Sequence, residues 1–140
     1  MASPRGASAP CVFCDIVAGK APAYKVYEDA STLAFLDLYP FTRGHLLVIP
    51  KRHGARLTDF SHADQAAVVR TLETIVRRVE RLAPDYNVAL NAGANAGQIV
   101  FHLHFHVIPR YGEANPFHSV QRTRLTDEQA SGVVAELSVP

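Results

Sequence analysis

Hydrophobic and polar residues are arranged along the chain in runs that predict five strands and one long helix. Apolar, β-branched and aromatic residues gather in short runs bounded by turn-forming residues, a pattern typical of strands. The predicted strands cover residues 24–28, 32–37, 45–49, 86–91 and 98–109. Between the third and fourth runs, apolar residues recur at helical spacing from Ser61 until Pro84. Because arginine and glutamate fill the intervening positions, this stretch predicts an amphipathic helix.

Shorter helices are expected at both ends of the chain. Residues 11–19 allow one or two helical turns that end at Gly19. Thr126 and Gln129 form a capping box that opens a final helix through Leu137. Strands so close in sequence usually pair antiparallel. We therefore predict an α+β fold: a five-stranded antiparallel sheet with one long helix and short terminal helices.

The chain length and composition predict one globular domain. Its 140 residues are 48% apolar and 19% charged, which is ordinary for a soluble protein with its own core. Residues 1–10, rich in alanine, serine and proline, predict a disordered leader. Residues 11–140 then form the domain, with a C-terminal extension from about residue 112, where the hydrophobic periodicity is lost.

Charge and hydropathy exclude several kinds of partner. The formal net charge of +1 argues against nucleic-acid binding, which favours a strongly basic face. Any bound anion is therefore expected to be small and held locally. No apolar run approaches the roughly 20 residues of a membrane span, and residues 1–10 lack the apolar core of a secretory signal. We expect no membrane association and a cytoplasmic location.

Three histidines stand out in the last predicted strand. His102, His104 and His106 alternate with apolar residues. On a strand, alternate side chains share one face, so neighbouring imidazoles are expected about 7 Å apart and pointing the same way. A single histidine in such a run is more often structural than catalytic. Three at this spacing favour a functional site in which imidazoles converge on one small anionic group.

This stretch can be compared with a known signature. The run His-φ-His-φ-His-φ-φ, where φ is apolar, spans residues 102–108 and resembles the histidine triad (HIT) family. The likeness extends to residues 35–37, 44–53, 91–93, 96–98 and 109–111. In all it covers about residues 11–111 and looks closest to the bacterial Hint-like branch. The resemblance implies a homodimer that binds a purine nucleoside monophosphate or a derivative.

The resemblance also implies residue roles. A neutral imidazole can attack phosphorus without first losing a proton, and the family assigns this step to the middle histidine, His104. His106 is expected to stabilise the phosphate charge, and His45 to support the triad by hydrogen bonding. The resemblance further implies a set of nucleotide-binding residues: Asp37 for the ribose, Leu38 beside the sugar and base, and Asn91, Gly97, Gln98 and Ile99 around the phosphate.

The reaction implied is hydrolysis or transfer at the α-phosphate, as in an adenosine phosphoramidate, through a nucleotidyl-histidine intermediate. Two alternatives stay open: a dinucleoside polyphosphate hydrolase, and a nucleotide-binding regulator with slow turnover. Histidine rather than glutamine at position 106 fits the hydrolase branches better than the nucleotidyl-transferase branch. Ile99 departs from the serine of several relatives, so protonation of the leaving group is expected to be weaker here.

A pair of cysteines raises the question of a metal. Cys11 and Cys14 are spaced to chelate a soft dication, but spacing alone leaves a metal-free thiol pair and a redox disulfide open. The resemblance to zinc-containing bacterial relatives points to His53 and His102 as the two missing ligands. Such a site is coordinatively closed, so the expected cofactor is a structural zinc ion, and no catalytic metal is required.

Overall fold

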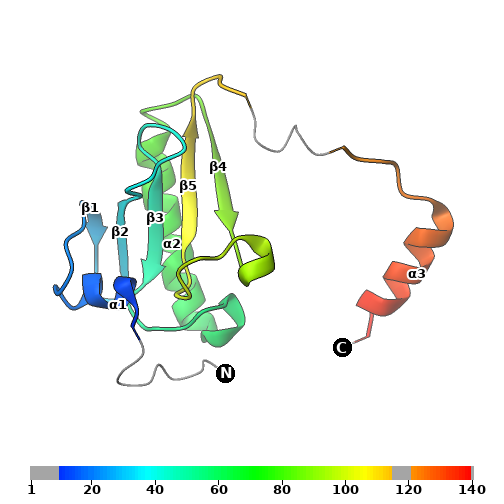
Figure 1. The fold of residues 1–140 in the computed structure, drawn as a ribbon, viewed down its shortest axis with the longest axis horizontal. Helices are drawn as coiled ribbons and strands as arrows, with labels where there is room; N and C mark the ends of the chain where they lie inside the picture. The colour runs from blue at the N-terminus through cyan, green and yellow to red at the C-terminus, as the bar shows by residue number, and fades with distance from the viewer. Residues whose placement is uncertain (1–9, 115–120, 140) are drawn as a thin grey trace.

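The computed structural model describes residues 10–114 and 121–139. Apart from Pro10, the predicted leader lies outside the described residues. The chain forms the predicted five-stranded antiparallel sheet (Figure 1). Its strands lie side by side in the order β1 (Lys25–Glu28), β2 (Thr32–Leu36), β3 (Leu46–Pro50), β5 (Phe105–Arg110) and β4 (Asp85–Leu90). The predicted fold class is confirmed.

Helix α2 (His62–Val79) covers one face of the sheet (Figure 1). It begins where predicted, because the Ser61 side chain accepts a hydrogen bond from the Asp64 backbone N–H at 3.1 Å. Its buried stripe joins side chains of β2, β3 and β5 in one cluster of Ala34, Leu46, Val48, Val68, Ile75, Val79 and Val107. Two residues predicted to share the apolar side of the helix, Val69 and Leu82, are exposed instead.

The short helix α1 (Val12–Val17) packs on the opposite face of the sheet. Alternate residues of a strand point to opposite faces, and Phe35 of β2 therefore points away from α2. The Phe13 ring packs edge-on against Phe35 with centroids 5.4 Å apart. His106 pairs with Leu47 of β3, which belongs to the same apolar cluster as Phe35. The histidine of β5 thus lies on the α1 side of the sheet.

Strand β5 is shorter than predicted, and this corrects the expected placement of the histidines. It begins at Phe105 and not at residue 98. His102 and His104 therefore lie in the loop before the strand, and only His106 lies within it. The three rings therefore do not all lie on one strand, because the chain bends at residues 100–102 and joins the sheet only at Phe105.

The neighbouring strands explain why β5 begins so late. Phe105 pairs with Val48 of β3 and with Leu90, the last residue of β4. Further along β3, Pro50 has no backbone N–H, and its carbonyl oxygen lies 2.7 Å from Nε2 of His102. Neither neighbour offers a free ladder partner to residues 98–104, although these residues have a strand-like composition.

Helix α3 (Asp127–Leu137) begins at the predicted capping box. The Gln129 backbone N–H donates to Thr126 Oγ1 at 3.2 Å, and the Thr126 backbone N–H donates to Gln129 Oε1 at 3.0 Å. The helix has no buried residue and stands apart from the sheet (Figure 1). Within the described parts of the chain, no helix is long and apolar enough to cross a membrane.

Candidate active site

His104 lies in the loop just before β5, next to His106. The two ring centroids are 5.1 Å apart, and His104 is 6% exposed. Nδ1 of His104 lies 2.7 Å from the carbonyl oxygen of His102. A carbonyl oxygen only accepts hydrogen bonds, so Nδ1 carries the hydrogen of the neutral ring and Nε2 keeps its lone pair. His104 therefore has the tautomer that a nitrogen nucleophile needs.

His106 is held by a second buried imidazole, His45. The Phe41 backbone N–H donates to Nδ1 of His45 at 3.1 Å, so His45 carries its own hydrogen on Nε2. That group donates to Nδ1 of His106 at 2.9 Å, which leaves the hydrogen of a neutral His106 on Nε2. Asp37 Oδ2 lies 3.5 Å from His45 Nε2 and 3.9 Å from His106 Nδ1. His106 can thus donate a hydrogen bond where His104 offers a lone pair.

Burial favours the neutral form of the imidazole rings of His45, His104 and His106. Desolvation lowers the pKa of His104 and of His45, and the Asp37 carboxylate opposes part of this effect. The pKa of His106 falls to about 4, mainly because of burial and further because His104 and His45 lie close to it. At pH 7 the rings are therefore neutral, as the tautomers deduced above require.

A glycine-flanked turn connects β4 to residues 98–104, the loop that carries His102 and His104 and is called the histidine loop below. Gly93 and Gly97 border the 3-10 turn η2 (Ala94–Ala96) with φ values of +91° and +90°, a region open mainly to glycine. Gln98 is buried beneath this loop. Its Oε1 accepts from the Gly93 backbone N–H at 2.7 Å, and its Nε2 donates to the Ala55 carbonyl at 3.1 Å. Gln98 braces the loop, and its direct contact with a phosphate stays a prediction.

The other predicted nucleotide-binding residues lie on loops around the histidines. Asp37 follows β2, and its Oδ1 accepts a hydrogen bond from a backbone N–H two residues on, at 2.8 Å. Asn91 follows β4, and its Nδ2 lies 3.8 Å from the position that a Cβ at Gly97 would take. Leu38 is exposed, and Ile99 is 87% exposed. The structure places Asn91 beside the loop, but the roles of these residues stay predictions.

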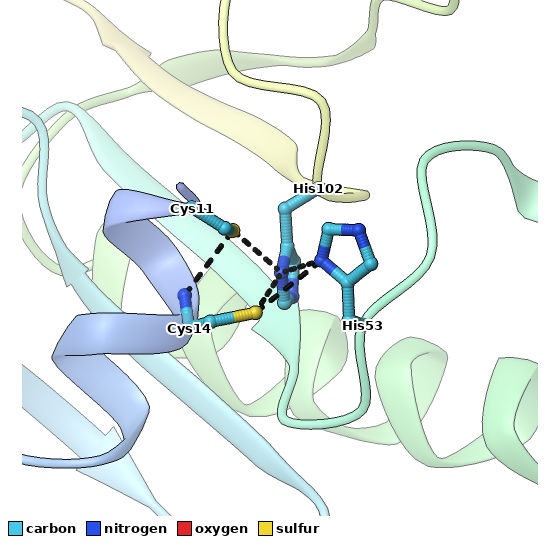
Figure 2. A group of neighbouring side chains, drawn as sticks. All are labelled: Cys11, Cys14, His53 and His102. Atoms are coloured by element: carbon cyan, nitrogen blue, oxygen red, sulfur yellow. Dashed lines mark hydrogen bonds between the residues drawn. The ribbon is translucent and has the colours of Figure 1, made fainter. Parts of the chain in front are cut away.

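A second cluster lies beside α1, where Cys11, Cys14, His53 and His102 point toward one another (Figure 2). Their ligand atoms all lie within 4.8 Å of one another. Cys14 Sγ is 3.3 Å from Nδ1 of His53 and 3.6 Å from Nδ1 of His102, and Cys11 Sγ is 3.6 Å from the same His102 atom. The Pro50 carbonyl accepts from Nε2 of His102, so Nδ1 presents its lone pair to the cluster.

These spacings match the edges of a tetrahedral metal site. Zinc bonds of about 2.05 Å to nitrogen and about 2.3 Å to sulfur give edges of roughly 3.3 Å between nitrogens and roughly 3.5 Å between nitrogen and sulfur. The two Nδ1 atoms of His53 and His102 are 3.3 Å apart, and the nitrogen-to-sulfur distances lie in the same range. The cluster is therefore a possible Cys2His2 metal site.

Sequence reasoning missed the backbone groups that position these rings. The N–H of Phe41 and the carbonyl of Pro50 each fix the tautomer of one histidine. The carbonyl of Gly54 accepts the N–H of Leu103 at 2.7 Å and so anchors the histidine loop. Every residue has such groups, so no residue type signals them. Phe13 is a buried core residue whose ring also packs edge-on to His104, with centroids 5.2 Å apart.

Comparison with known proteins identifies the family. The sequence profile of the HIT domain matches residues 18–113. The chain belongs to the HIT family. The resemblance predicted from the histidine run is thereby confirmed for this HIT protein.

Three relatives are informative. An adenosine 5'-monophosphoramidase from Candida albicans is 41% identical over 112 residues, which cover 76% of this chain and 74% of the relative. The crystal structure of a HIT-family member from Bacillus subtilis is 38% identical, covers 91% of this chain and 94% of its own, and has a TM-score of 0.81. A zinc-bound histidine triad protein from Mycobacterium smegmatis is 40% identical, with coverages of 91% and 94% and a TM-score of 0.63.

Proposed function

We propose that this HIT protein hydrolyses purine nucleoside monophosphate derivatives of the adenosine phosphoramidate type. The observation that carries this proposal is the tautomer of His104. Its Nδ1–H is held by the His102 carbonyl at 2.7 Å, and burial lowers its pKa, so an unprotonated Nε2 is available at neutral pH. The activity named for the Candida albicans relative supports the same reaction class.

The proposed reaction has two displacements at phosphorus. Nε2 of His104 attacks the α-phosphorus, the bond from phosphorus to the amine nitrogen breaks, and the amine leaves with a proton from solvent. Water then attacks the nucleotidyl-imidazole, and the nucleoside monophosphate is released. The Nε2–H of His106 and the backbone N–H of Ile99 would donate to the nonbridging oxygens. The Gly97 backbone N–H donates to the Ala94 carbonyl at 3.0 Å and would have to exchange this partner for a phosphate oxygen. Asp37 would accept hydrogen bonds from the ribose hydroxyls.

Ile99 is expected to limit the leaving groups that the site can process. Its backbone N–H can bind phosphate, but its side chain has no hydroxyl to donate a proton. Substrates with good leaving groups should therefore turn over faster than those that need protonation as the bond breaks.

A cleavage assay with trapping of the intermediate tests the proposal. The protein is incubated with adenosine 5'-phosphoramidate and, separately, with a diadenosine polyphosphate, and AMP release is followed. Mass spectrometry of the quenched enzyme should detect an adenylyl group on His104. H104A should lose both cleavage and adduct, whereas H62A, at an exposed histidine of α2, should keep both. Undiminished cleavage by H104A would show that the nucleophile is misassigned.

The same assay separates the alternatives. Preferred cleavage of the diadenosine polyphosphate would favour the polyphosphate hydrolase. Tight nucleotide binding without cleavage of either compound would favour a nucleotide-binding regulator.

We also propose that Cys11, Cys14, His53 and His102 hold a structural zinc ion. The distances between their ligand atoms support a tetrahedral site, and the Mycobacterium smegmatis relative is zinc-bound. Four protein ligands would leave no open position on the ion, so it would stabilise the fold by tying α1 to the histidine loop. Metal analysis of the purified protein tests this.

A homodimer and a cytoplasmic location complete the proposal. Among residues 10–114 and 121–139, β4 has a strand neighbour, β5, on one side only. Its exposed side chains include Tyr86 and Val88, the latter 45% exposed. An unpaired edge strand with exposed apolar residues favours pairing with another strand. Light scattering of the purified protein tests the dimer, and imaging of the tagged protein in its host tests the location.

A further inference from the structure

Both cysteines of the chain lie in the cluster beside α1 (Figure 2). Their Sγ atoms lie within 4.8 Å of each other, and each is 3.6 Å from the same atom, Nδ1 of His102. The chain has two cysteines in all, so an internal disulfide would have to join Cys11 to Cys14. A movement of less than about 3 Å separates these sulfurs from a bond of about 2.05 Å.

The backbone around the cysteines permits this closure. Side chains three residues apart on a helix have Cβ atoms about 5–6 Å apart, and a disulfide needs about 3.5–4.5 Å, so a shift of about 1–2 Å is enough. Cys11 lies before the first helical residue, with extended backbone angles of φ −148° and ψ 108°. It can therefore make this shift without unwinding α1, which Phe13 and Ile16 hold in the core.

The two thiols differ in their accessibility. Cys14 is half-buried, whereas Cys11 is 6% exposed and belongs to the apolar cluster that contains Phe13 and Phe35. A small oxidant in the solvent therefore reaches Sγ of Cys14 first. Reversible thiol sensors combine one accessible cysteine with a neighbouring cysteine that closes the disulfide. Cys14 and Cys11 fit these two roles.

The reaction has two balanced steps, with a peroxide as the oxidant. Hydrogen peroxide oxidises the Cys14 thiol to a sulfenic acid and is itself reduced to water. Sγ of Cys11 then attacks Sγ of Cys14, the S–O bond breaks, and the hydroxyl group leaves with the hydrogen of the Cys11 thiol as a second water. In total, two thiols and one peroxide give one disulfide and two waters.

Closure of the disulfide would remove half of the proposed metal site. Sulfur binds a dication as a thiolate, and a disulfide sulfur carries no negative charge. Two of the four proposed ligands, His53 and His102, would be left, which is too few for a closed tetrahedral site. A disulfide between Cys11 and Cys14 and an ion at the cluster therefore exclude each other.

The same change reaches the histidine loop through its backbone. His102 faces both sulfurs through Nδ1, and its carbonyl accepts the Nδ1–H of His104 at 2.7 Å. The N–H of Leu103 donates to the carbonyl of Gly54 at 2.7 Å, and Gly54 directly follows His53. Without an ion, His53 and His102 are no longer tied to α1. These two hydrogen bonds should therefore open more often.

We propose that Cys11 and Cys14 form a reversible oxidation site, whose disulfide displaces the ion and loosens the histidine loop. The consequences rest on the zinc site and the hydrolase activity proposed above, whereas the disulfide itself rests on the two thiols alone. The reduced protein is then the active form, and the oxidised protein is an attenuated form that a reductant restores.

The first test detects the bond in the full-length protein. The reduced protein is treated with hydrogen peroxide, its remaining thiols are alkylated under denaturing conditions, and its peptides are weighed by mass spectrometry. We expect the peptide that holds both cysteines to lose two hydrogens and to take up no alkylating reagent. Tris(2-carboxyethyl)phosphine should return both thiols. The matched control C11S keeps Cys14, so it should stop at the sulfenic acid, which dimedone traps.

The second test measures the consequences before oxidation, after oxidation and after reduction with added zinc. Elemental analysis gives the bound zinc, hydrogen exchange by NMR gives the protection of the Leu103 amide, and AMP release gives kcat. We expect oxidation to release the zinc and to lower both the Leu103 protection and kcat about tenfold. All three should recover on reduction. The amide of Val107, in the central strand β5, should keep its protection and so show that the sheet stays folded.

The variant H53A separates the disulfide from the metal. It removes one proposed ligand and leaves both thiols in place. Because an ion would then compete less well for the sulfurs, H53A should retain less zinc and should form the disulfide at least as fast as the wild type.

The outcomes distinguish this inference from the proposals on which its consequences rest. Peroxide that takes Cys14 to a sulfinic acid, or joins it to a second chain, without forming the internal bond would overturn the oxidation site. An internal disulfide that changes neither the zinc content nor the Leu103 protection would overturn it as well. A wild type that holds no zinc but closes the disulfide and loosens Leu103 would refute the zinc site and support the oxidation site. Absence of phosphoramidate cleavage in the reduced protein would refute the enzyme assignment, while the disulfide and the Leu103 protection would still decide this inference.

Discussion

Acid should destabilise this protein through His106, and the size of the effect follows from its environment. In the folded state the pKa of His106 is about 4, against an ordinary value of 6.5. The unfolded chain therefore binds more protons than the folded chain between these two values, so stability is complete above about pH 6.5 and falls as the pH drops toward 4. At about pH 5 the loss from this one group amounts to about 2 kcal/mol. The lowered pKa of His45 acts in the same direction.

Urea unfolding at about pH 7.5 and about pH 5 measures this loss of unfolding free energy on acidification. Chelator is present, and the protein concentration is the same at both pH values. We expect the wild type to lose at least about 2 kcal/mol more than H106Q over this interval, because glutamine has no proton to gain. H62Q replaces an exposed histidine at the start of α2 and should keep the wild-type pH dependence. If H106Q and the wild type lose the same free energy on acidification, His106 is not a buried neutral imidazole.

Three further predictions concern groups that hold the site in place. C14S should lower Tm by roughly 5 °C or more, as measured by calorimetry, and should abolish co-purification of metal, as measured by elemental analysis. The D15N control should change neither Tm nor metal content. An unchanged metal content in C14S would contradict the proposed ligand set. H45F should lower kcat about 10- to 100-fold with little change in KM, because His106 loses the donor that fixes its tautomer; a change confined to KM would assign His45 to binding. Q98A should cost about 1 kcal/mol or more in urea unfolding, because it leaves a half-buried N–H and two half-buried carbonyl groups without the partner that Gln98 supplies. A stability equal to the wild type would show that the loop is held by other contacts.

Much of the fold was predictable because its signals are local. The capping interactions of Ser61 and Thr126 lie where the sequence predicts helix starts, and the apolar runs predict all five strands. The start of β5 was not predictable from its own residues. It depends on Pro50, which ends the ladder from the neighbouring strand and accepts a hydrogen bond from His102. Strand propensity reports how a run fits a sheet but not whether a partner strand is still there.

The histidines show the same limit of prediction from local sequence. Their spacing was enough to find the site, but a shared face of one strand was the wrong geometry for it. His104 and His106 are two residues apart at the entry to β5, and their ring centroids are 5.1 Å apart, whereas the ring of His102 contacts the cysteine sulfurs. Their tautomers depend on backbone groups and on His45, which is 61 residues away from His106 in sequence. Such contacts are set by tertiary structure and leave no local pattern.

His102 links the two clusters physically. Its Nδ1 faces the cysteine sulfurs, its Nε2 bonds to the carbonyl of Pro50, and its own carbonyl accepts the Nδ1–H of His104. A ligand held at the cluster would restrict the His102 ring, and the peptide that follows this ring sets the tautomer of His104. The first histidine of the run therefore acts on the second through its backbone and not through its ring. This would explain how one short motif could serve the proposed metal site and the proposed nucleophile at once, without routing the chemistry through the metal.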